Sequence, residues 1–344
     1  MKKIVFRSTF MFLLTAFLLY YILKDNFFES VNLLFSSNIL FLLLAILVWF
    51  LYFLAEAILL KLLINKHNDK YSLKQSLLLN IMSKFFNGIT PFSLGGQPLQ
   101  VYQLSRDNVK VTDGVLVVTE MFIIHEISLI FLILVSILCK YLFSINPNSF
   151  LWGITIFGLI FNSIGLLIAV FVSLKINAAK KIGSGIISFF NKIKIIKNKE
   201  KSIEGWYNKC NEYSNGFKDM VNNKKLIFKC VVLNVINFIF YALVPYFIIL
   251  AIDSSVNINI FYTIILTMLA YVSSTFVPIP GGSVGMEYAY VNYYILFAPE
   301  SIVLTSLILW RFISYYFPMI LGGIIFNIVD NKKARMCKED ANNI

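Results

Sequence analysis

Two residues of opposite charge, Glu287 and Arg311, lie within long apolar stretches of the sequence. A charged side chain is costly in a hydrocarbon environment, so such residues usually mark a functional site. The carboxylate and the guanidinium could pair directly, or each could bind one end of a zwitterionic ligand. A purely structural ion pair is the alternative, because buried charges of opposite sign also hold helices together.

Glu287 follows one of two interruptions in otherwise apolar segments, TPFSLGGQPLQVYQ (Thr90–Gln103) and VPIPGGSVGMEYAY (Val277–Tyr290). Each interruption contains proline and a glycine pair. Interrupted hydrophobic segments at corresponding places in two halves of a chain are typical of the binding site of a membrane transporter. An offset of 187 residues aligns three pairs: Pro91 with Pro278, Gly95 with Gly282, and Gln100 with Glu287.

Backbone and amide groups near the interruptions could bind an anionic headgroup. The helix that restarts after each glycine pair exposes N–H groups, whose partial positive charge suits phosphate. Gln97, Gln100 and Gln103 follow the first interruption and offer amide donors and acceptors. We therefore expect the two interruptions, with Glu287 and Arg311, to form a substrate site.

A second group of ionisable residues consists of Glu120, His125 and Glu126. Helical spacing places Glu120 and His125 on neighbouring faces of one helix. Histidine titrates near neutral pH, so the group is a candidate for proton coupling, with an interior hydrogen-bonded histidine as the alternative. Leu129 stands where the zinc pattern HExxH has its second histidine. We expect no metal and no other cofactor.

The elements that must position these residues are membrane helices. Apolar residues make up 58% of the chain and charged residues 14%, with a mean hydropathy of +0.77. A soluble domain carries about 25% charged residues, and a bilayer-spanning helix needs roughly 20 apolar residues. We predict an all-α polytopic membrane protein with six full spans, at 4–23, 39–63, 115–139, 150–174, 226–252 and 301–328, and two broken segments, at 77–104 and 260–297.

The lysines of the chain predict how these helices are oriented. The net charge is +12, and the linker 175–225 between two spans has 12 lysines against 4 acidic residues. Basic loops mark the cytoplasmic side of a membrane, so the charge indicates topology and not nucleic-acid binding. We expect a multi-pass protein of the bacterial plasma membrane with both termini in the cytoplasm. The apolar residues among the lysines of Lys180–Lys194 predict a helix on the inner membrane surface, with docking of a soluble partner as the alternative.

This orientation makes each broken segment enter and leave on one side of the membrane. Segment 77–104 begins and ends inside, and segment 260–297 begins and ends outside. Both are predicted to be re-entrant hairpins, with tips at Pro91–Gly96 and Pro278–Gly282, because irregular backbone at that depth must be buried in protein or line a watery cavity. The predicted organisation is one membrane domain (1–344) with two inverted halves (1–139 and 150–328) and the basic linker (175–225) within the second half.

Three stretches resemble the lysylphosphatidylglycerol synthase transmembrane family, the flippase-like membrane domain of the multiple peptide resistance factor. They are NGITPFSLGGQPLQVYQL at 87–104, VPIPGGSVGMEYAY at 277–290 and WRFISYYFPMILGG at 310–323. Many relatives have Glu in place of Gln97 and Arg in place of Gln100, so the first hairpin is less charged here. The resemblance implies functional roles for Gly96, Gln97, Pro280, Gly281, Gly282, Gly285, Glu287 and Arg311.

The resemblance also implies that an amphiphile, typically an aminoacylated or glycosylated lipid, moves between leaflets. Full-length members add a soluble C-terminal aminoacyl transferase, whereas only residues 329–344 follow the last predicted span. We therefore expect a flippase-like protein that binds anionic or aminoacylated phospholipid, such as lysyl-phosphatidylglycerol, with a separate cytoplasmic lipid synthase as a candidate partner. Two alternatives stay open: a lipid-modifying enzyme of the phosphatidylglycerol lysyltransferase type that uses Glu120, His125 and Glu126, and a scaffold that presents its basic linker to a synthase.

Overall fold

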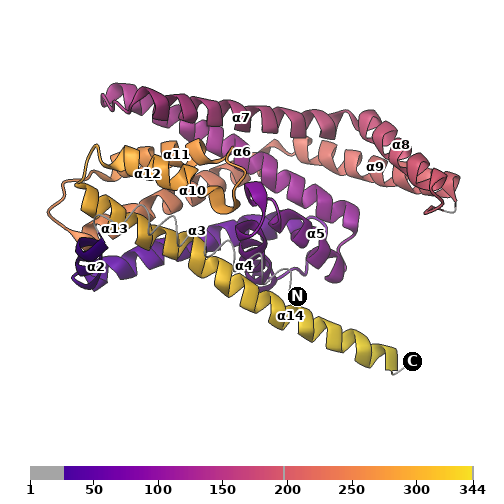
Figure 1. Cartoon of the computed structure of the whole chain (residues 1–344). Coiled ribbons are helices and arrows are strands. Elements are labelled where there is room, and N and C mark those ends of the chain that lie inside the picture. Colours follow the sequence, from indigo (N-terminus) through magenta and orange to yellow (C-terminus); the bar gives the residue numbers. More distant parts are fainter. Residues whose placement is uncertain (1–26, 197, 343–344) are drawn as a thin grey trace.

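The computed structural model describes residues 27–196 and 198–342, and the regular structure in these residues is helical throughout (Figure 1). The prediction of an all-α protein is confirmed, while the predicted span 4–23 lies outside the described residues. The α-helices are α2 (Phe27–Phe35), α3 (Ile39–Ile64), α4 (Leu73–Gly88), α5 (Gly96–Arg106), α6 (Val111–Leu142), α7 (Ser149–Leu174), α8 (Ile176–Lys192), α9 (Lys199–Asn222), α10 (Lys224–Ile252), α11 (Ile260–Ser274), α12 (Gly285–Tyr294), α13 (Glu300–Arg311) and α14 (Phe317–Asn342). Short turns are η1 (Pro91–Ser93), η2 (Pro280–Gly282) and the π-helical η3 (Phe312–Tyr316).

Five helical stretches of the described chain are long and apolar enough to cross a membrane. They match the predicted spans to within a few residues: Ile39–Ile64, Val111–Leu142, Ser149–Leu174, Lys224–Ile252 and Glu300–Asn331. The last of these is one continuous helix made of α13, η3 and the first part of α14. Many of their apolar side chains face outward, as expected for helices whose solvent is lipid.

Short polar side chains set the starts of several helices. Asn38 accepts a hydrogen bond from the N–H of Leu40 at the start of α3, and Asn148 accepts one from Leu151 in α7. Ser72 and Gln75 form a reciprocal capping box at the start of α4. These caps satisfy N–H groups that the first helical turn leaves without partners.

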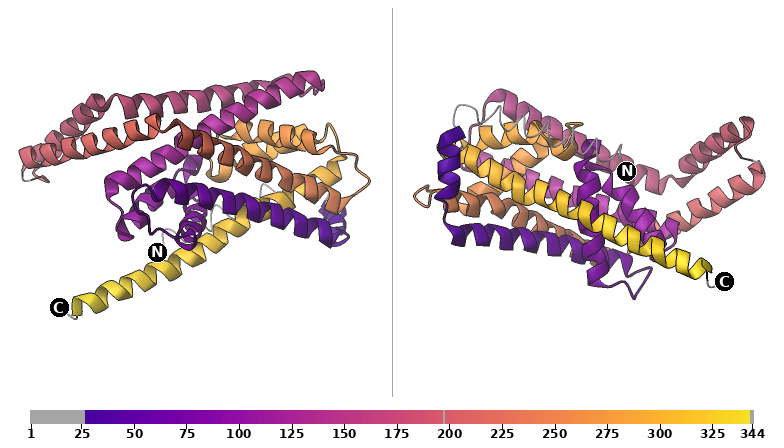
Figure 2. Two further views of the ribbon diagram at one scale, coloured as in Figure 1. Left: turned by 180° about the vertical axis from the view of Figure 1, so that it is seen from behind. Right: turned by 60° about the horizontal axis from the view of Figure 1, so that its bottom comes forward.

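The antiparallel helices α3 and α10 pack along each other, and α4, α6 and α13 pack against one or both of them (Figures 1 and 2). The N–H of Asn38 donates to the carbonyl of Ala251 at 2.7 Å, which places the start of α3 beside the end of α10. Near the middle of both helices, the Asn237 amide donates to the carbonyl of Tyr52 at 2.6 Å. These contacts define two ends of the molecule. One end holds the start of α3 and the end of α10, and the other holds the end of α3 and the start of α10.

Two helical hairpins enter this framework from opposite ends. In the first, α4 and α5 are joined through η1, and the Asn68 amide donates to the carbonyl of Asp107 at 3.4 Å across the hairpin's base. In the second, α11 and α12 are joined through η2, and the Tyr294 hydroxyl donates to the carbonyl of Thr263 at 3.3 Å. The two turns η1 and η2 contact each other, so the hairpins meet at their tips.

The turns correspond at an offset of 189 residues and not the 187 suggested by the sequence. This offset aligns η1 with η2 and the start of α5, Gly96, with the start of α12, Gly285. The residue opposite Glu287 is then Pro98, so the pairing of Gln100 with Glu287 is wrong. The glycine pairs misled the alignment because the second turn uses its glycines inside the turn and the first places them after it.

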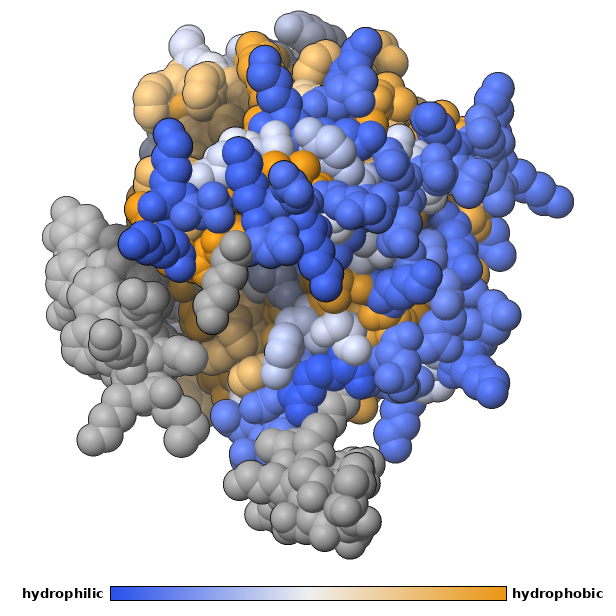
Figure 3. Space-filling view, turned by 90° about the vertical axis from the view of Figure 1, so that its right-hand side faces the viewer, coloured by the Kyte–Doolittle hydropathy of each residue, from blue (hydrophilic) through white to orange (hydrophobic). Residues whose placement is uncertain are grey.

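The linker 175–225 forms a second kind of hairpin, made of α8 and α9, which projects beyond the ends of the spans (Figure 1). The sequence predicted a helix at 180–194 but not the long α9, and it did not predict α2. The C-terminal part of α14 extends toward the same end (Figure 2). Seen from that end, hydrophilic side chains cover much of the described surface (Figure 3).

Candidate functional site

The two charged residues singled out in the sequence form an ion pair at the second hairpin tip. Glu287 lies in the first turn of α12 and Arg311 ends α13, and Nε of Arg311 is 2.8 Å from Oε1 of Glu287. Each side chain is only 3% exposed. The low exposure matters because the attraction between two charges grows as water is excluded.

Arg311 also holds the backbone of the turn. Both terminal guanidinium nitrogens donate to the carbonyl of Gly281 at 3.3 Å, and Nη2 donates to the hydroxyl of Ser283 at 2.9 Å. The planar guanidinium therefore binds a carboxylate on one edge and the tip backbone on another, which a lysine could not do. Among the described residues, neither carboxylate oxygen of Glu287 accepts a hydrogen bond, so its contact with Arg311 is one of charge.

Glycine is required at the second tip for two reasons. Gly281 has φ of +67°, a left-handed conformation that costs an L-residue roughly 1–2 kcal/mol. A Cβ atom at Gly281 would also lie 2.3 Å from the ring of Tyr315. Tyr315 stacks beneath the Arg311 guanidinium, 4.5 Å from ring centre to Cζ, and its hydroxyl donates to the carbonyl of Gly88 at 2.9 Å. Tyr315 therefore contacts both hairpins.

The first tip has the same turn but holds it differently. Phe92 and Ser93 adopt left-handed φ values of 54° and 55° in the places of Gly281 and Gly282. The Thr90 hydroxyl accepts from the N–H of Gly95 at 2.8 Å, and the Asn87 side chain accepts from the N–H of Gly96 at 2.7 Å. Neutral side chains thus satisfy the N–H groups that were expected to face phosphate.

The remaining predicted site residues of the first hairpin lie near its tip without joining the ion pair. Pro91 is exposed, and Gln97 and Gln100 are half-buried in the first turns of α5. At the second tip, Pro280 is buried, Gly282 has φ of +61°, and Gly285 begins α12. The tips contact each other through η1 and η2, so the predicted residues gather in one region.

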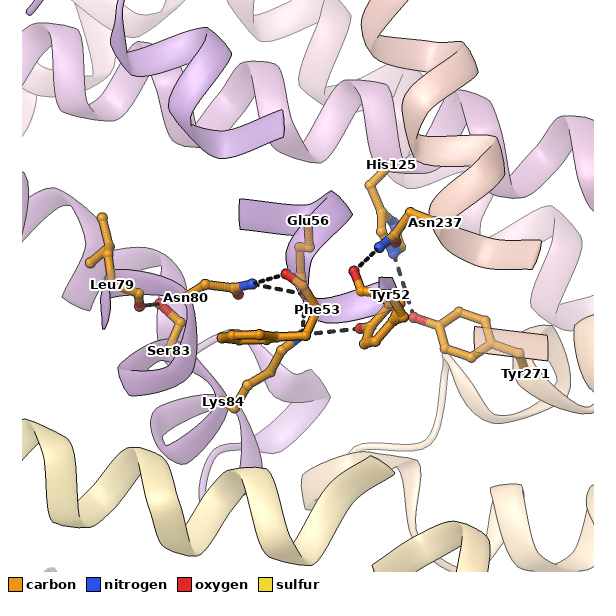
Figure 4. A network of polar contacts seen from close by, with 10 residues as sticks. All are labelled: Tyr52, Phe53, Glu56, Leu79, Asn80, Ser83, Lys84, His125, Asn237 and Tyr271. Atoms are coloured by element: carbon orange, nitrogen blue, oxygen red, sulfur yellow. Dashed lines mark hydrogen bonds and ion pairs between the residues drawn. The ribbon is translucent and has the colours of Figure 1, made fainter. Parts of the chain in front are cut away.

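A second polar network lies in the interior beside the first hairpin (Figure 4). Lys84 of α4 is 2.6 Å from Oε2 of Glu56 in α3, and it donates to the Tyr52 hydroxyl at 3.0 Å. The Asn80 amide donates to the same carboxylate oxygen at 3.2 Å. The side chains of Lys84 and Glu56 are 18% and 24% exposed, so this pair is more accessible than the pair at the second tip.

Aromatic rings connect the two charged pairs. The ring of Tyr241 in α10 lies 5.4 Å from that of Tyr52 and 5.6 Å from that of Trp310, the neighbour of Arg311 in sequence. The Tyr271 ring lies 5.7 Å from Tyr241 on another side. Tyr241 therefore stands between the Glu56–Lys84 pair and the Glu287–Arg311 pair.

The predicted group of Glu120, His125 and Glu126 divides into two environments. Glu120 is fully buried, and both of its carboxylate oxygens lie 3.1 Å from the Lys66 ammonium. His125 instead lies 3.5 Å from Glu126 and 3.5 Å from the Tyr271 hydroxyl. Glu120 is thus committed to Lys66, and only His125 and Glu126 remain near each other. Across residues 27–196 and 198–342, no set of three or more His, Cys, Asp or Glu side chains is placed to hold a metal ion.

Sequence reasoning missed residues that the structure places in these sites: Lys66, Ser283 and Tyr315. Tyr315 follows Arg311 by four residues, so the helical period already put both on one face. Ser283 directly follows the glycine pair, which was a usable signal for a residue of the turn. Lys66 gave no such signal, because its contact with Glu120 joins positions 54 residues apart.

Comparison with known proteins adds one finding to this geometry. The model of a family described as "Lysylphosphatidylglycerol synthase TM region" matches residues 8–322. The match includes both hairpins, both charged pairs and most of the last membrane helix. No curated protein matches the chain.

Proposed function

Because the chain belongs to the lysylphosphatidylglycerol synthase TM family, we propose that it binds a phospholipid headgroup between its two hairpin tips and moves the lipid from one leaflet to the other. The chain is a multi-pass membrane protein of a family with a lipid-related role. Lipid translocation is the step we add. The proposed ligand is an anionic or aminoacylated phospholipid, with lysyl-phosphatidylglycerol as a candidate.

The proposed topology has six full spans and two opposed re-entrant hairpins in the bacterial plasma membrane. Both termini and the linker 175–225 would lie in the cytoplasm, as the lysine distribution predicts. The halves 1–139 and 150–328 would be inverted repeats. Two hairpins that enter from opposite ends and meet at their tips support this arrangement.

The observation that carries the proposal is the buried Glu287–Arg311 pair at the tip of an interrupted helix. Removing one member of a buried pair is costly, but exchanging its partner keeps every charge compensated. A headgroup phosphate could replace Glu287 on Arg311, and a headgroup amine could bind the released carboxylate. The hydrogen bonds from Arg311 to Gly281 and Ser283 would then break, which would free the tip to move.

The second charged pair gives the headgroup a further place to bind. Glu56 and Lys84 are partly exposed and lie beyond Tyr241 from Arg311. A headgroup that leaves the tips would meet this carboxylate and ammonium next. The acyl tails would stay outside, against the apolar side chains that the spans expose.

Leaflet-resolved transport of labelled phosphatidylglycerol and its lysyl ester, in liposomes that contain the purified protein, tests the proposal. The decisive variant is Glu287→Gln combined with Arg311→Gln, because it removes both charges and leaves no buried charge unpaired. We expect this variant to fold and to lose most of the acceleration. Arg106→Gln is the matched control, since Arg106 pairs with Asp330 near the end of the molecule and away from the tips.

Normal transport by the folded double variant would show that the pair does not handle the lipid. If the unmodified protein accelerates the movement of neither lipid between leaflets, that result would favour the scaffold or transferase alternatives. The transferase alternative needs Glu120, His125 and Glu126 to act together, and the Lys66–Glu120 pair argues against that.

A further inference from the structure

The projecting helix α8 carries a stripe of large apolar side chains that face outward. Ile182, Ile186, Phe189 and Ile193 are 65%, 52%, 60% and 50% exposed. Their spacing of four, three and four residues places them on one face of the helix. Large apolar side chains that line up in solvent indicate a surface that something covers.

The other side of α8 is already occupied by α9. The Trp206 indole donates to the carbonyl of Ala179 at 3.2 Å, and a Cβ atom at Gly183 would lie 2.1 Å from that indole nitrogen. Gly183 therefore lets α9 pack closely against α8. The exposed stripe takes no part in the contact between α8 and α9.

The stripe comes directly after a membrane span that also has an apolar outward face. In α7, Ile160, Ile164, Leu167 and Phe171 are exposed at the same spacing. Only Lys175 separates the two helices, so α8 begins directly where this lipid-facing span ends.

The charge around the stripe has one sign. Residues 175–199 include seven lysines and no acidic residue. Lysines that flank the apolar face of a helix attract anionic headgroups while the apolar side chains insert among them. The charge complementarity and the continuity with α7 favour the same occupant, an anionic lipid surface.

We propose that α8 docks on the anionic surface of the membrane that α7 spans, with Ile182, Ile186 and Phe189 inserted among the headgroups. The hairpin is held near this surface by its base, where the Tyr213 hydroxyl lies 2.8 Å from that of Ser173. Lys175, where the backbone leaves helical geometry with ψ of 58°, sets the direction in which α8 leaves the span. This inference is independent of lipid translocation.

A fluorescent probe that senses water, attached to Ile186→Cys, tests the docking. The full chain would carry serine at its native cysteines, Cys139, Cys210, Cys230 and Cys337. The protein is placed in nanodiscs of phosphatidylglycerol or of phosphatidylcholine. The matched control is a probe at Ser184→Cys, two residues away and about 200° around the helix.

In phosphatidylglycerol we expect the emission at position 186 to shift to shorter wavelength and its quenching by aqueous iodide to fall severalfold. Position 184 should change little, and phosphatidylcholine should give a weaker effect at 186. Replacing Lys180, Lys181 and Lys192 with glutamine should reduce the difference between the two lipids.

Three results would overturn the proposal. The first is emission and iodide quenching at position 186 that do not differ between phosphatidylglycerol and phosphatidylcholine nanodiscs. The second is protection that depends on two copies of the chain in one nanodisc and not on lipid charge, which would show that a second copy covers the stripe. The third is protection in native membranes but not in purified anionic nanodiscs, which would show that a soluble partner covers it.

Discussion

The two hairpin tips form the same turn by different means. At the second tip, glycines occupy the left-handed positions and a buried arginine holds the backbone through Gly281 and Ser283. At the first tip, Phe92 and Ser93 take the left-handed conformation, and the side chains of Thr90 and Asn87 bind the free N–H groups. One tip is charged and buried, and the other is neutral with Phe92 41% exposed.

This difference separates the contacts that the turn needs for its shape from the charged pair that only the second tip has. The first tip shows that neutral side chains can hold such a turn, so its shape alone does not explain a buried glutamate and arginine. Burying an ion pair seldom increases stability over an apolar replacement of the same volume. The charges at the second tip therefore favour a role in binding.

The largest expected effect comes from breaking the ion pair on one side only. Arg311→Gln leaves Glu287 buried without its partner and frees the tip backbone, so we expect a loss of about 3–5 kcal/mol in the free energy of unfolding. Unfolding of the purified protein in detergent, followed by circular dichroism, measures it. At the partly exposed pair Arg106–Asp330, Arg106→Gln should cost at most about 1 kcal/mol. Equal losses of unfolding free energy in the two variants would mean that the Glu287–Arg311 pair stabilises the fold no more than an ordinary surface ion pair does.

A methyl group at the second tip should have the next largest effect. Gly281→Ala must adopt φ of +67° and push against the Tyr315 ring, which we expect to cost about 2–4 kcal/mol in unfolding free energy. Phe92→Gly at the matching position of the first tip should change stability by less than about 1 kcal/mol, because relief of the left-handed strain offsets the entropy cost of glycine. A large loss of stability in Phe92→Gly would show that the phenylalanine side chain itself stabilises the first tip.

A smaller effect is expected from the caps of the first tip. Asn87→Ala removes the acceptor for the N–H of Gly96 and should cost about 0.5–1.5 kcal/mol. Hydrogen exchange at the start of α5, measured by mass spectrometry, should rise while exchange at the start of α12 stays unchanged. A rise at both helices would show that the two tips are not stabilised separately.

The smallest effect concerns the bases of the hairpins and their response to pH. Burial lowers the pKa of His67, before the first hairpin, and the nearby Asp113 carboxylate opposes only part of that shift. The unfolded chain therefore binds this proton more readily, so stability should fall as the pH drops below about 6.5. At the base of the second hairpin, hydrogen bonds from Ser255 lower the pKa of Asp253, and the corresponding loss should begin only near pH 4. Thermal unfolding at pH 7.5 and 5.5 tests this, and His67→Gln should reduce the difference.

The sequence predicted the helical class and the bounds of five spans because each span is a long uninterrupted apolar run. It did not predict α9, since Lys199–Asn222 is mostly polar, although its buried side chains, Cys210, Ser214, Phe217 and Met220, recur every three or four residues as in a helix. The offset between the halves was also two residues short. Glycine is an unreliable marker there, because non-glycine residues fill the left-handed positions of the first tip.

For the candidate site, sequence reasoning found residues whose chemistry is costly in a membrane. Glu287 and Arg311 were noticeable as charges within apolar segments, and the structure joins them into one pair. Sequence reasoning could not show which charged residues pair with each other, because such contacts depend on packing between distant helices. The pairing of Glu120 with Lys66, and not with His125, is of this kind.

The position of Tyr315 has a consequence for kinetics. Its hydroxyl binds the first hairpin at Gly88, and its ring fills the space over Gly281 in the second. A displacement of the helix that carries Tyr315 changes both tips in the same event. Release of the two tips would then proceed over one activation barrier, and a time-resolved probe on either tip would record the same single rate constant.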